Sequence, residues 1–260
     1  MKKILLVEGN LKEANQEFTE NGIKTHTESL QESISYYTNS LEIDSVNPSS
    51  DKDIFSKVKD LNKYEGLIWG GSSLNIYSDT KEIRRQIEFM KECQKKIKNI
   101  LAICWGMQVA VTAAGGVVNR GKNGAHRGIA HEIVINSDGL NHPIYKDKDK
   151  IFNTPAFNYD EVVTLPKDAI LLSSNKVNNV MALNFDAEMS KIWGIQYHPE
   201  ITYDKMITLI RFRRERLLEN KSFSDEKDLE SHISMIEKED KITKKESRMR
   251  ELKNWLDLIA

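Results

Sequence analysis

The stretch from residue 99 to residue 111 constrains the fold of this chain most. An apolar run ends at Cys104, with a small residue two positions before it (Ala102) and another two positions after it (Gly106), and apolar residues then resume. This pattern predicts a strand, a sharp turn and a helix, because a strained turn brings its small neighbours almost into contact. Cys104 would then stand at a helix N-terminus, where unpaired N–H groups and the helix dipole favour a thiolate. We therefore predict that Cys104 is a nucleophile.

Two other interpretations of this stretch compete with that prediction. Free cysteines are among the most buried residue types, so Cys104 could be inert core packing, and the spacing alone does not decide between the two. A membrane span is excluded, because Gln108 interrupts the run and the run is shorter than the ~20 apolar residues that a span requires.

The composition is that of a soluble globular protein. The 38 Lys and Arg nearly cancel the 39 Asp and Glu, so no charge excess favours nucleic acid or a membrane surface as a partner. The only two cysteines are Cys93 and Cys104. A disulfide framework is therefore not expected, and the cytoplasm is the expected compartment. The apolar run near the N-terminus is too short for a signal peptide and predicts a first strand.

The first 115 residues alternate between predicted strands and helices. Strands are expected at 3–7, 42–46, 66–69 and 99–103. Helices are expected at 11–20, 29–41 and 81–96, with one more helical turn suggested by Ile54, Val58 and Leu61. Asn10 is expected to cap the first helix, and Asp79 or Thr80 the third. This alternation predicts an α/β fold with a mostly parallel central sheet flanked by helices.

The predicted secondary structure changes twice after residue 115. Short strands, expected to form added β-hairpins, are predicted at 132–135, 162–165, 170–173, 180–183 and 191–197. From residue 204 onward the pattern is helical, and we divide the chain into a domain of residues 1–203 and a C-terminal helical extension of residues 204–260. The extension carries two apolar stripes: Met206, Leu209, Ile210 and Leu217, then Leu252, Trp255, Leu256 and Ile259. These stripes must be buried, so the extension is expected to serve stability or assembly, and a homo-oligomer stays open.

Four arginines, at positions 211, 213, 214 and 216, lie in the same predicted helical segment as the first apolar stripe. A solvated helix face is the favoured interpretation of this cluster, because charges of both signs surround it. Binding of an anion or a partner is the alternative.

A second chemical pattern is the segment from Gln196 to Glu200. Pro199 forces His198 into an extended conformation. Residues two apart in an extended segment project to the same side, so Glu200 can orient the His198 ring. An oriented imidazole is what a thiol nucleophile needs as its general base, so Cys104, His198 and Glu200 form a candidate triad.

Gly70 and Gly71 form a third pattern, because they directly follow a predicted buried strand. Two glycines allow a backbone N–H to point into a site. Together with the N–H of Trp105, this would make a two-donor oxyanion hole. Glycine pairs after strands are also common turns, so the pattern alone is not specific.

In this order and spacing, Gly70-Gly71, residues 102–108 and residues 196–200 resemble the class I glutamine amidotransferases. The resemblance covers about residues 1–203 and leans toward the glutaminase unit of guanosine monophosphate synthetases and its stand-alone relatives. It implies a flavodoxin-like fold and hydrolysis of the side-chain amide of glutamine through a cysteine thioester. The roles it implies are Cys104 as nucleophile, His198 as base and acid, Glu200 as its orienter, Gly71 and Trp105 as oxyanion donors, and Gly70 and Gln108 as substrate-binding residues.

Three segments depart from the family's pattern. Ala102 stands where the family usually has glycine, and Phe157-Asn158-Tyr159-Asp160-Glu161-Val162 lacks the histidine of the family's Ser-His-Xaa-Asp-Xaa-Val segment. His126-Arg127-Gly128 stands where the family has a Glu-Xaa-Gly that helps to position glutamine. These departures bear on the substrate and the partner rather than on the triad.

Three functions follow as hypotheses. The first is a glutaminase that delivers ammonia to a separate ATP-dependent synthase. Another protein would have to activate the ammonia acceptor, because residues 116–123 only approach a phosphate-binding loop. No cofactor or metal is expected. The second is a γ-glutamyl amide or peptide hydrolase with water as its only acceptor, since the changes at His126 and Asn158 could widen the pocket. The third is a non-catalytic regulatory binding protein, against which the intact Cys104, His198 and Glu200 argue.

Overall fold

The computed structural model describes residues 2–57 and 59–259. Its largest sheet contains β1 (Lys2–Val7), β2 (Leu41–Val46), β3 (Gly66–Trp69), β4 (Asn99–Ile103), β7 (Ala130–Ile135), β8 (Ile151–Thr154), β11 (Ile170–Ser174), β12 (Ala182–Ala187) and β13 (Ser190–Ile195). Two small sheets pair β5 (Val117–Arg120) with β10 (Asp160–Thr164), and β6 (His126–Arg127) with β9 (Phe157–Asn158).

The helices alternate with the strands in the N-terminal half and follow one another at the C-terminus. They are α1 (Lys12–Glu20), α2 (His26–Tyr37), α3 (Ile54–Lys57), α4 (Lys81–Gln94), α5 (Trp105–Ala113), α6 (Ser137–Asn141), α7 (Tyr203–Phe212), α8 (Arg214–Glu219), α9 (Glu226–Ile242), α10 (Lys245–Arg248) and α11 (Arg250–Ile259). Short 3₁₀ turns are η1 (Leu61–Lys63), η2 (Ile76–Ser78) and η3 (Pro143–Tyr145).

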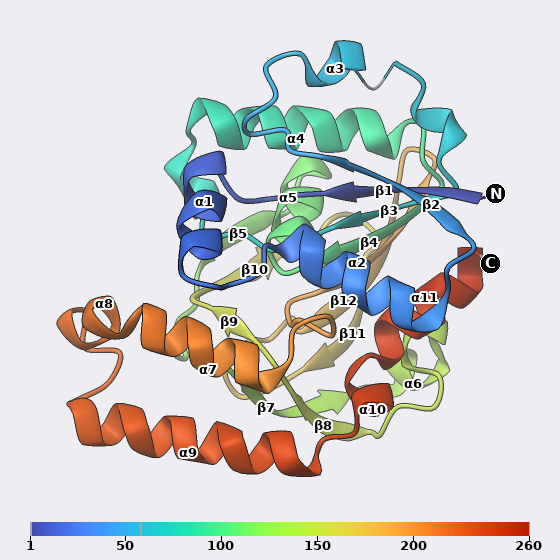
Figure 1. Ribbon diagram of the computed structural model, residues 1–260. Helices are drawn as coiled ribbons and strands as arrows, with labels where there is room; N and C mark the ends of the chain where they lie inside the picture. Colours follow the sequence, from blue (N-terminus) through green and yellow to red (C-terminus); the bar gives the residue numbers. More distant parts are fainter. Residues whose placement is uncertain (1, 58, 260) are drawn as a thin grey trace.

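The central sheet is mixed. Within the described residues its nine strands run in the order β2-β1-β3-β4-β13-β12-β11-β7-β8. From β2 to β13 neighbouring strands are parallel, whereas from β13 to β8 they are antiparallel (Figure 1). The predicted α/β fold is therefore confirmed, and most of the predicted hairpin strands extend the same sheet, as expected.

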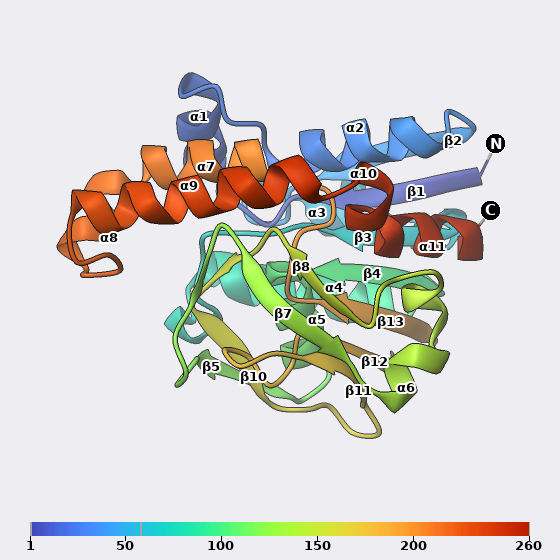
Figure 2. The same ribbon diagram turned by 90° about the horizontal axis from the view of Figure 1, so that it is seen from below.

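Helices cover the sheet on both faces, because successive strand residues point to opposite sides. Leu5 and Val7 face the apolar cluster that contains residues of α4 and α5. Ile4 and Leu6 face the cluster that contains residues of α2 and α11. Figure 2 shows α2 and α11 on the same side of the sheet as α7 and α9. Two cores therefore sandwich the parallel strands.

The C-terminal helices share these cores with the strands. Leu252, Trp255, Leu256 and Ile259 of α11 are all buried among residues of the sheet. The Trp255 ring lies so close to Gly66 that a Cβ there would meet it at 2.7 Å. A third cluster joins α7, α8 and α9 through Ile210, Leu217 and Ile236, although Leu209 is only half-buried. The expected burial of the two stripes is thus observed for every member except Leu209.

Two predicted helix starts were wrong. Helix α1 begins at Lys12 without a side-chain cap, and Asn10 Oδ1 instead accepts from the Ser73 N–H at 2.9 Å. Helix α2 begins at His26, because Thr25 and Glu28 form a capping box. It ends at Tyr37, so Leu41 belongs to β2. Thr80 caps α4 as one of the two predicted residues, whereas the predicted helical position of Val58 lies outside the described residues.

A buried ion pair ties α11 to the centre of the molecule. Lys148 Nζ lies 3.0 Å from Glu251 Oε1, and both side chains are almost fully buried. The Tyr197 hydroxyl donates to the same carboxylate at 2.7 Å and lies 2.9 Å from the Tyr145 hydroxyl. Tyr197 directly precedes His198, so this network connects the C-terminal helix to the segment that carries the candidate base.

We expect Lys148→Met to lower the free energy of unfolding by roughly 3–5 kcal/mol, because it leaves the Glu251 carboxylate buried without its counter-charge. The matched control is Lys253→Met on α11, where the lysine pairs with Asp257 at the surface. That change should cost less than about 0.5 kcal/mol. Urea unfolding of the two variants measures the difference. Equal stabilities would show that the buried pair contributes nothing specific.

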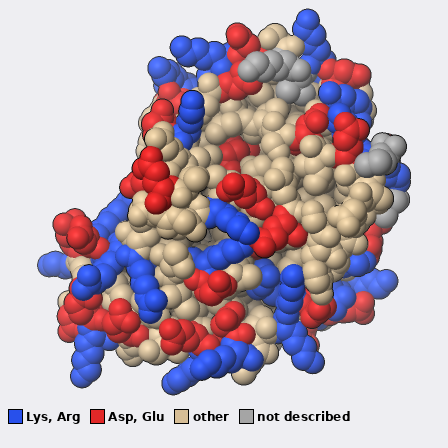
Figure 3. All heavy atoms as spheres, in the orientation of Figure 1, with Lys and Arg blue, Asp and Glu red and all other residues tan. Residues whose placement is uncertain are grey.

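No helix in the described part of the chain combines the length and the apolar character needed to cross a bilayer. Figure 3 shows Lys and Arg interspersed with Asp and Glu over one face of the molecule.

Candidate functional site

Cys104 stands on a strained turn between β4 and α5. Its backbone has φ 53° and ψ −104°, an unusual conformation for a residue with a side chain. The turn needs glycine at position 106, because a Cβ there would lie 2.4 Å from the carbonyl oxygen of Trp69. The Gly106 N–H donates to the Gly70 carbonyl at 3.2 Å. The predicted strand, sharp turn and helix are confirmed, and Cys104 directly precedes the first residue of α5.

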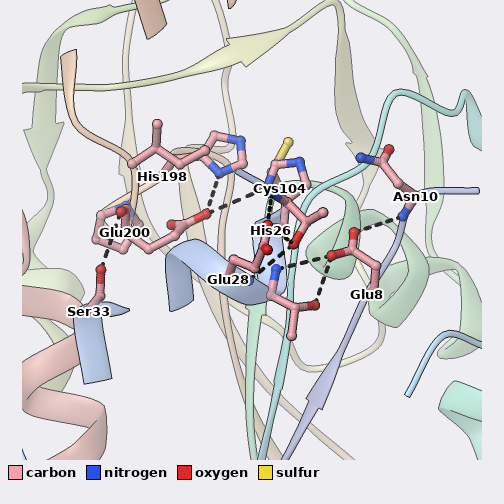
Figure 4. Close-up of polar contacts among 12 residues, drawn as sticks. Glu8, Asn10, His26, Glu28, Ser33, Cys104, His198 and Glu200 are labelled. Atoms are coloured by element: carbon pink, nitrogen blue, oxygen red, sulfur yellow. Dashed lines mark hydrogen bonds and ion pairs between the residues drawn. The ribbon is translucent and has the colours of Figure 1, made fainter. Parts of the chain in front are cut away.

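His198 and Glu200 lie in the segment that follows β13. The His198 N–H donates to the Pro155 carbonyl at 2.8 Å, which fixes the backbone. His198 Nδ1 lies 2.8 Å from Glu200 Oε1, so Nε2 is left for another partner. In the view of Figure 4 the His198 ring lies between the Glu200 carboxylate and the Cys104 sulfur. Gln196 also reaches the site, with Nε2 donating to Cys104 Sγ at 3.4 Å.

Burial and charge shift the pKa values of His198 and Glu200 in opposite directions. Burial lowers the pKa of His198, but attraction to Glu200 and Cys104 and hydrogen bonds to both outweigh it and raise that pKa to about 10. Burial raises the pKa of Glu200, but attraction and hydrogen bonding to His198, with His26 adding to them, lower it to about 2. At neutral pH the pair is therefore an imidazolium and a carboxylate.

His26, which the sequence analysis did not single out, completes this cluster. Its ring stacks on His198 with centroids 5.3 Å apart and planes 21° apart, and its Nδ1 lies 3.9 Å from Glu200 Oε1 (Figure 4). The buried Glu8 carboxylate holds this end of α2 by accepting from the Thr27 N–H and hydroxyl at 3.0 and 2.8 Å. The capping-box pattern at Thr25 and Glu28 is the sequence signal that could have placed His26 at a helix start.

Gly71 lies against both histidine rings. A Cβ at this position would meet His26 Cε1 at 2.6 Å and His198 Cε1 at 2.8 Å, so only glycine leaves both rings in place. Among the hydrogen bonds of residues 2–57 and 59–259, none comes from the N–H of Gly71 or of Trp105. Trp105 lines a cavity beside Cys104, whereas Gly71 lines neither cavity at this site.

Two cavities adjoin the cluster. The Cys104 cavity, of about 70 Å³, is lined by Cys104, Trp105, Gln108 and Asn158 among others. The His198 cavity, of about 250 Å³, is lined by His198 and His26 together with residues of α1 and α7. The walls shared by both are Ser72, Ser73, Phe157 and Arg213. Of the two residues predicted to bind substrate, Gln108 lines a cavity and Gly70 lines neither.

His126 and Asn158, which both depart from the pattern described in the sequence analysis, contact each other. His126 Nδ1 lies 2.9 Å from Asn158 Oδ1 across the β6–β9 pair. Asn175 Nδ2 lies 2.9 Å from the other ring nitrogen, which assigns the donor role to Nδ1. Burial lowers the pKa of His126, so this ring is neutral at pH 7. A neutral His–Asn pair therefore supports the Asn158 wall of the Cys104 cavity.

His26, His198 and Glu200 also form a group that could ligate a metal ion, since their ligand atoms lie within 4.8 Å of one another. His198 Nδ1 and Glu200 Oε1 already pair with each other at 2.8 Å, so these two atoms are not free to ligate a metal ion.

The comparisons with known proteins point to one family. The sequence model of the family described as "Glutamine amidotransferase class-I" matches residues 22–213. The chain is 29% identical over 219 residues to a γ-glutamyl-L-1-hydroxyisopropylamide hydrolase from a Pseudomonas species, covering 77% of this chain and 74% of that protein. It is 30% identical over 162 residues to γ-glutamyl peptidase 4 of Arabidopsis thaliana, covering 60% of this chain and 61% of that protein.

A further relative carries a different name. One component of the glutamine-hydrolyzing GMP synthase of Methanosarcina acetivorans is 31% identical over 106 residues, covering 41% of this chain and 52% of that protein. Among solved structures, a glutamine amidotransferase from Thermotoga maritima is similar with a TM-score of 0.68 and 18% identity. That match covers 99% of this chain and 97% of the other, and it establishes the shared fold alone.

Proposed function

Because the chain belongs to the class I glutamine amidotransferase family and is a hydrolase of that family, we propose that it hydrolyses γ-glutamyl amides, with water as the only acceptor. Cys104 is the proposed nucleophile, His198 the acid and base, and Glu200 the residue that orients His198. The observation that carries the proposal is the Cys104 side chain on a strained turn, beside an imidazolium paired with a buried carboxylate.

The reaction begins with attack of the Cys104 sulfur, as a thiolate beside protonated His198, on the carbonyl carbon of the γ-amide. A C–S bond forms, and the carbonyl π electrons move to the oxygen. When this intermediate collapses, the C–N bond breaks and the leaving nitrogen takes the proton from His198 Nε2. The products of this half-reaction are a γ-glutamyl thioester and a free amine.

Water completes the cycle. The neutral His198 ring takes a proton from water as its oxygen attacks the thioester carbonyl, and the C–S bond then breaks. Glutamate leaves, its new carboxyl group loses a proton to solvent, and the thiolate and imidazolium are restored. The Glu200 carboxylate stabilises the imidazolium in both steps and keeps Nε2 directed at the reacting atoms.

The N–H groups of Gly71 and Trp105 are the proposed oxyanion donors. Neither has a hydrogen-bond partner among the described residues, and Trp105 stands at the N-terminus of α5, where the helix dipole favours negative charge. Gln108 lines the Cys104 cavity and is proposed to contact the amino-acid end of the glutamyl group.

Similarity to the two γ-glutamyl hydrolysing relatives supports water as the acceptor, because it extends over more of this chain than similarity to the synthase component. The paired change to His126 and Asn158 at the cavity wall supports a substrate other than glutamine. The second candidate is a glutaminase that passes ammonia to a separate synthase, which the similarity to the GMP synthase component favours.

Glutamate release by the purified protein separates these two functions. We expect kcat/KM for a γ-glutamyl alkylamide to exceed that for glutamine by about tenfold or more, since binding energy from the alkyl group lowers the barrier. Both rates are measured with the same coupled glutamate assay. Hydrolysis of glutamine without hydrolysis of any substituted γ-glutamyl amide would contradict the proposal and favour the glutaminase.

A further inference from the structure

In the proposed reaction, the two halves of the substrate occupy different cavities. During the reaction the acyl half is bonded to Cys104 Sγ, so it occupies the cavity that Cys104 lines together with Gln108. The leaving nitrogen takes its proton from His198, which lines only the other cavity. Whatever is attached to that nitrogen must therefore extend toward the His198 cavity.

We propose that the His198 cavity binds the amine half of the substrate, and that this half is an α-amino acid with an apolar side chain. The inference rests on the proposed function and names its substrate class as γ-glutamyl dipeptides. The cavity measures about 250 Å³. Ammonia is similar in size to water, which takes up roughly 30 Å³ in the liquid, so the leaving group of glutamine would leave most of this space unfilled.

The walls of the cavity are suited to an apolar side chain. Phe18 of α1, Ile23 after it, and Met206 and Leu209 of α7 all line the space. Phe18 and Met206 are buried, whereas Ile23 and Leu209 are half-buried at the wall. A leaving group with an aliphatic or aromatic side chain would remove the exposed parts of these residues from water.

Arg213 supplies a partner for a carboxylate. Its Nη2 donates to the Ser73 hydroxyl at 2.7 Å, and its guanidinium lies 4.9 Å from the centre of the Phe157 ring. Burial, then Arg216, lowers the pKa of Arg213 to about 10, so the side chain is still a cation at neutral pH. No carboxylate of residues 2–57 and 59–259 forms an ion pair with it, although Glu17 acts on it electrostatically.

The other charges on this cavity are already paired or lie at its rim. Lys24 and Lys205 each lie 2.9 Å from Glu32 Oε2. Asp204 is exposed and accepts from the Thr202 hydroxyl. Arg213 is thus the cation best placed to receive a substrate carboxylate through charge-assisted hydrogen bonds, which its planar guanidinium can form in pairs.

Three substrates and two variants test the inference. The substrates are γ-glutamyl-leucine, the γ-glutamyl 3-methylbutylamide that has the same carbon skeleton without the carboxylate, and glutamine. For the wild type we expect the highest kcat/KM with the dipeptide. Arg213→Gln should lower kcat/KM for the dipeptide by roughly tenfold or more and bring it close to that for the methylbutylamide. Leu209→Trp, which fills the cavity, should lower the dipeptide-to-glutamine ratio of kcat/KM.

Arg214→Gln is the matched control, because Arg214 is exposed and pairs with Glu226. It should leave all three rates unchanged, and thermal melting of every variant checks the fold. Equal losses for all three substrates in Arg213→Gln would overturn the assignment, since Arg213 would then bind the carboxylate of the glutamyl half. An equal loss with glutamine in Leu209→Trp would overturn the cavity's role. Failure of the proposed function looks different: the wild type would hydrolyse neither the dipeptide nor the methylbutylamide.

Discussion

Cys104→Ala is expected to abolish release of glutamate from γ-glutamyl amides while the protein keeps its fold. The side chain supplies the covalent step, so the expected loss is at least 10⁴-fold, on the order of that seen when other hydrolases lose their nucleophile. Alanine is smaller than cysteine and requires no new space on the strained turn. The measurement is the steady-state rate with the variant at high concentration, alongside a thermal melt.

Cys93→Ala is the matched control. Cys93 lies fully buried in α4, and burial raises its pKa, so its thiol should take no part in the reaction. This variant should keep the wild-type rate, with a small loss of stability from the missing sulfur. A Cys104→Ala variant with undiminished activity, or a Cys93→Ala variant without activity in a folded protein, would refute the role of Cys104.

His198→Ala and Glu200→Gln should differ in both rate and pH dependence. Loss of the imidazole removes proton transfer, at a cost of roughly 10²–10⁴-fold in kcat. Glu200→Gln should cost less, because the base remains but is no longer held or stabilised as an imidazolium. Protonated His198 is the acid, so wild-type activity should fall as the pH rises toward its pKa of about 10. Without Glu200, its attraction and hydrogen bond no longer raise that pKa, so the fall should move to lower pH.

The pH profile of kcat from pH 6 to pH 10.5 measures this shift. Glu246→Gln serves as the control, because it removes an exposed carboxylate that accepts from the Tyr36 hydroxyl. A Glu200→Gln profile that superimposes on the wild-type profile would contradict the role of Glu200. Wild-type kcat in folded His198→Ala would show that the imidazole is merely structural.

The parts of this fold that could be predicted are those in which local pattern and tertiary packing agree. The run before Cys104 is apolar because β4 is buried on both faces, and Gly106 is required by the Trp69 carbonyl. His198 and Glu200 are two residues apart, as the sequence suggests, but they meet through a turn and not through the predicted extended segment. The Ile201 N–H closes this turn on the His198 carbonyl at 3.4 Å.

The parts that could not be predicted depend on contacts between distant segments. His26 joins the cluster only because α2 packs across the sheet and Glu8 anchors its first turn. Asn10 resembles a helix cap in the sequence, yet its side chain bonds to the loop after β3. The sequence favours a solvated helix face for Arg213, because the charge pattern of that helix does not reveal that Ser73 and Phe157 lie beside this side chain.

The fate of the Cys104 sulfur during turnover tests the central claim most directly. Wild-type protein is mixed with γ-glutamyl p-nitroanilide, whose good leaving group speeds acylation, then quenched in acid within milliseconds and mapped by peptide mass spectrometry. The proposal predicts one added γ-glutamyl group on the peptide that contains Cys104, removable by hydroxylamine and absent from the Cys104→Ala protein. A burst of nitroaniline should accompany it. A γ-glutamyl group on any other residue, or nitroaniline released without a burst and without an adduct on Cys104, would contradict the proposal.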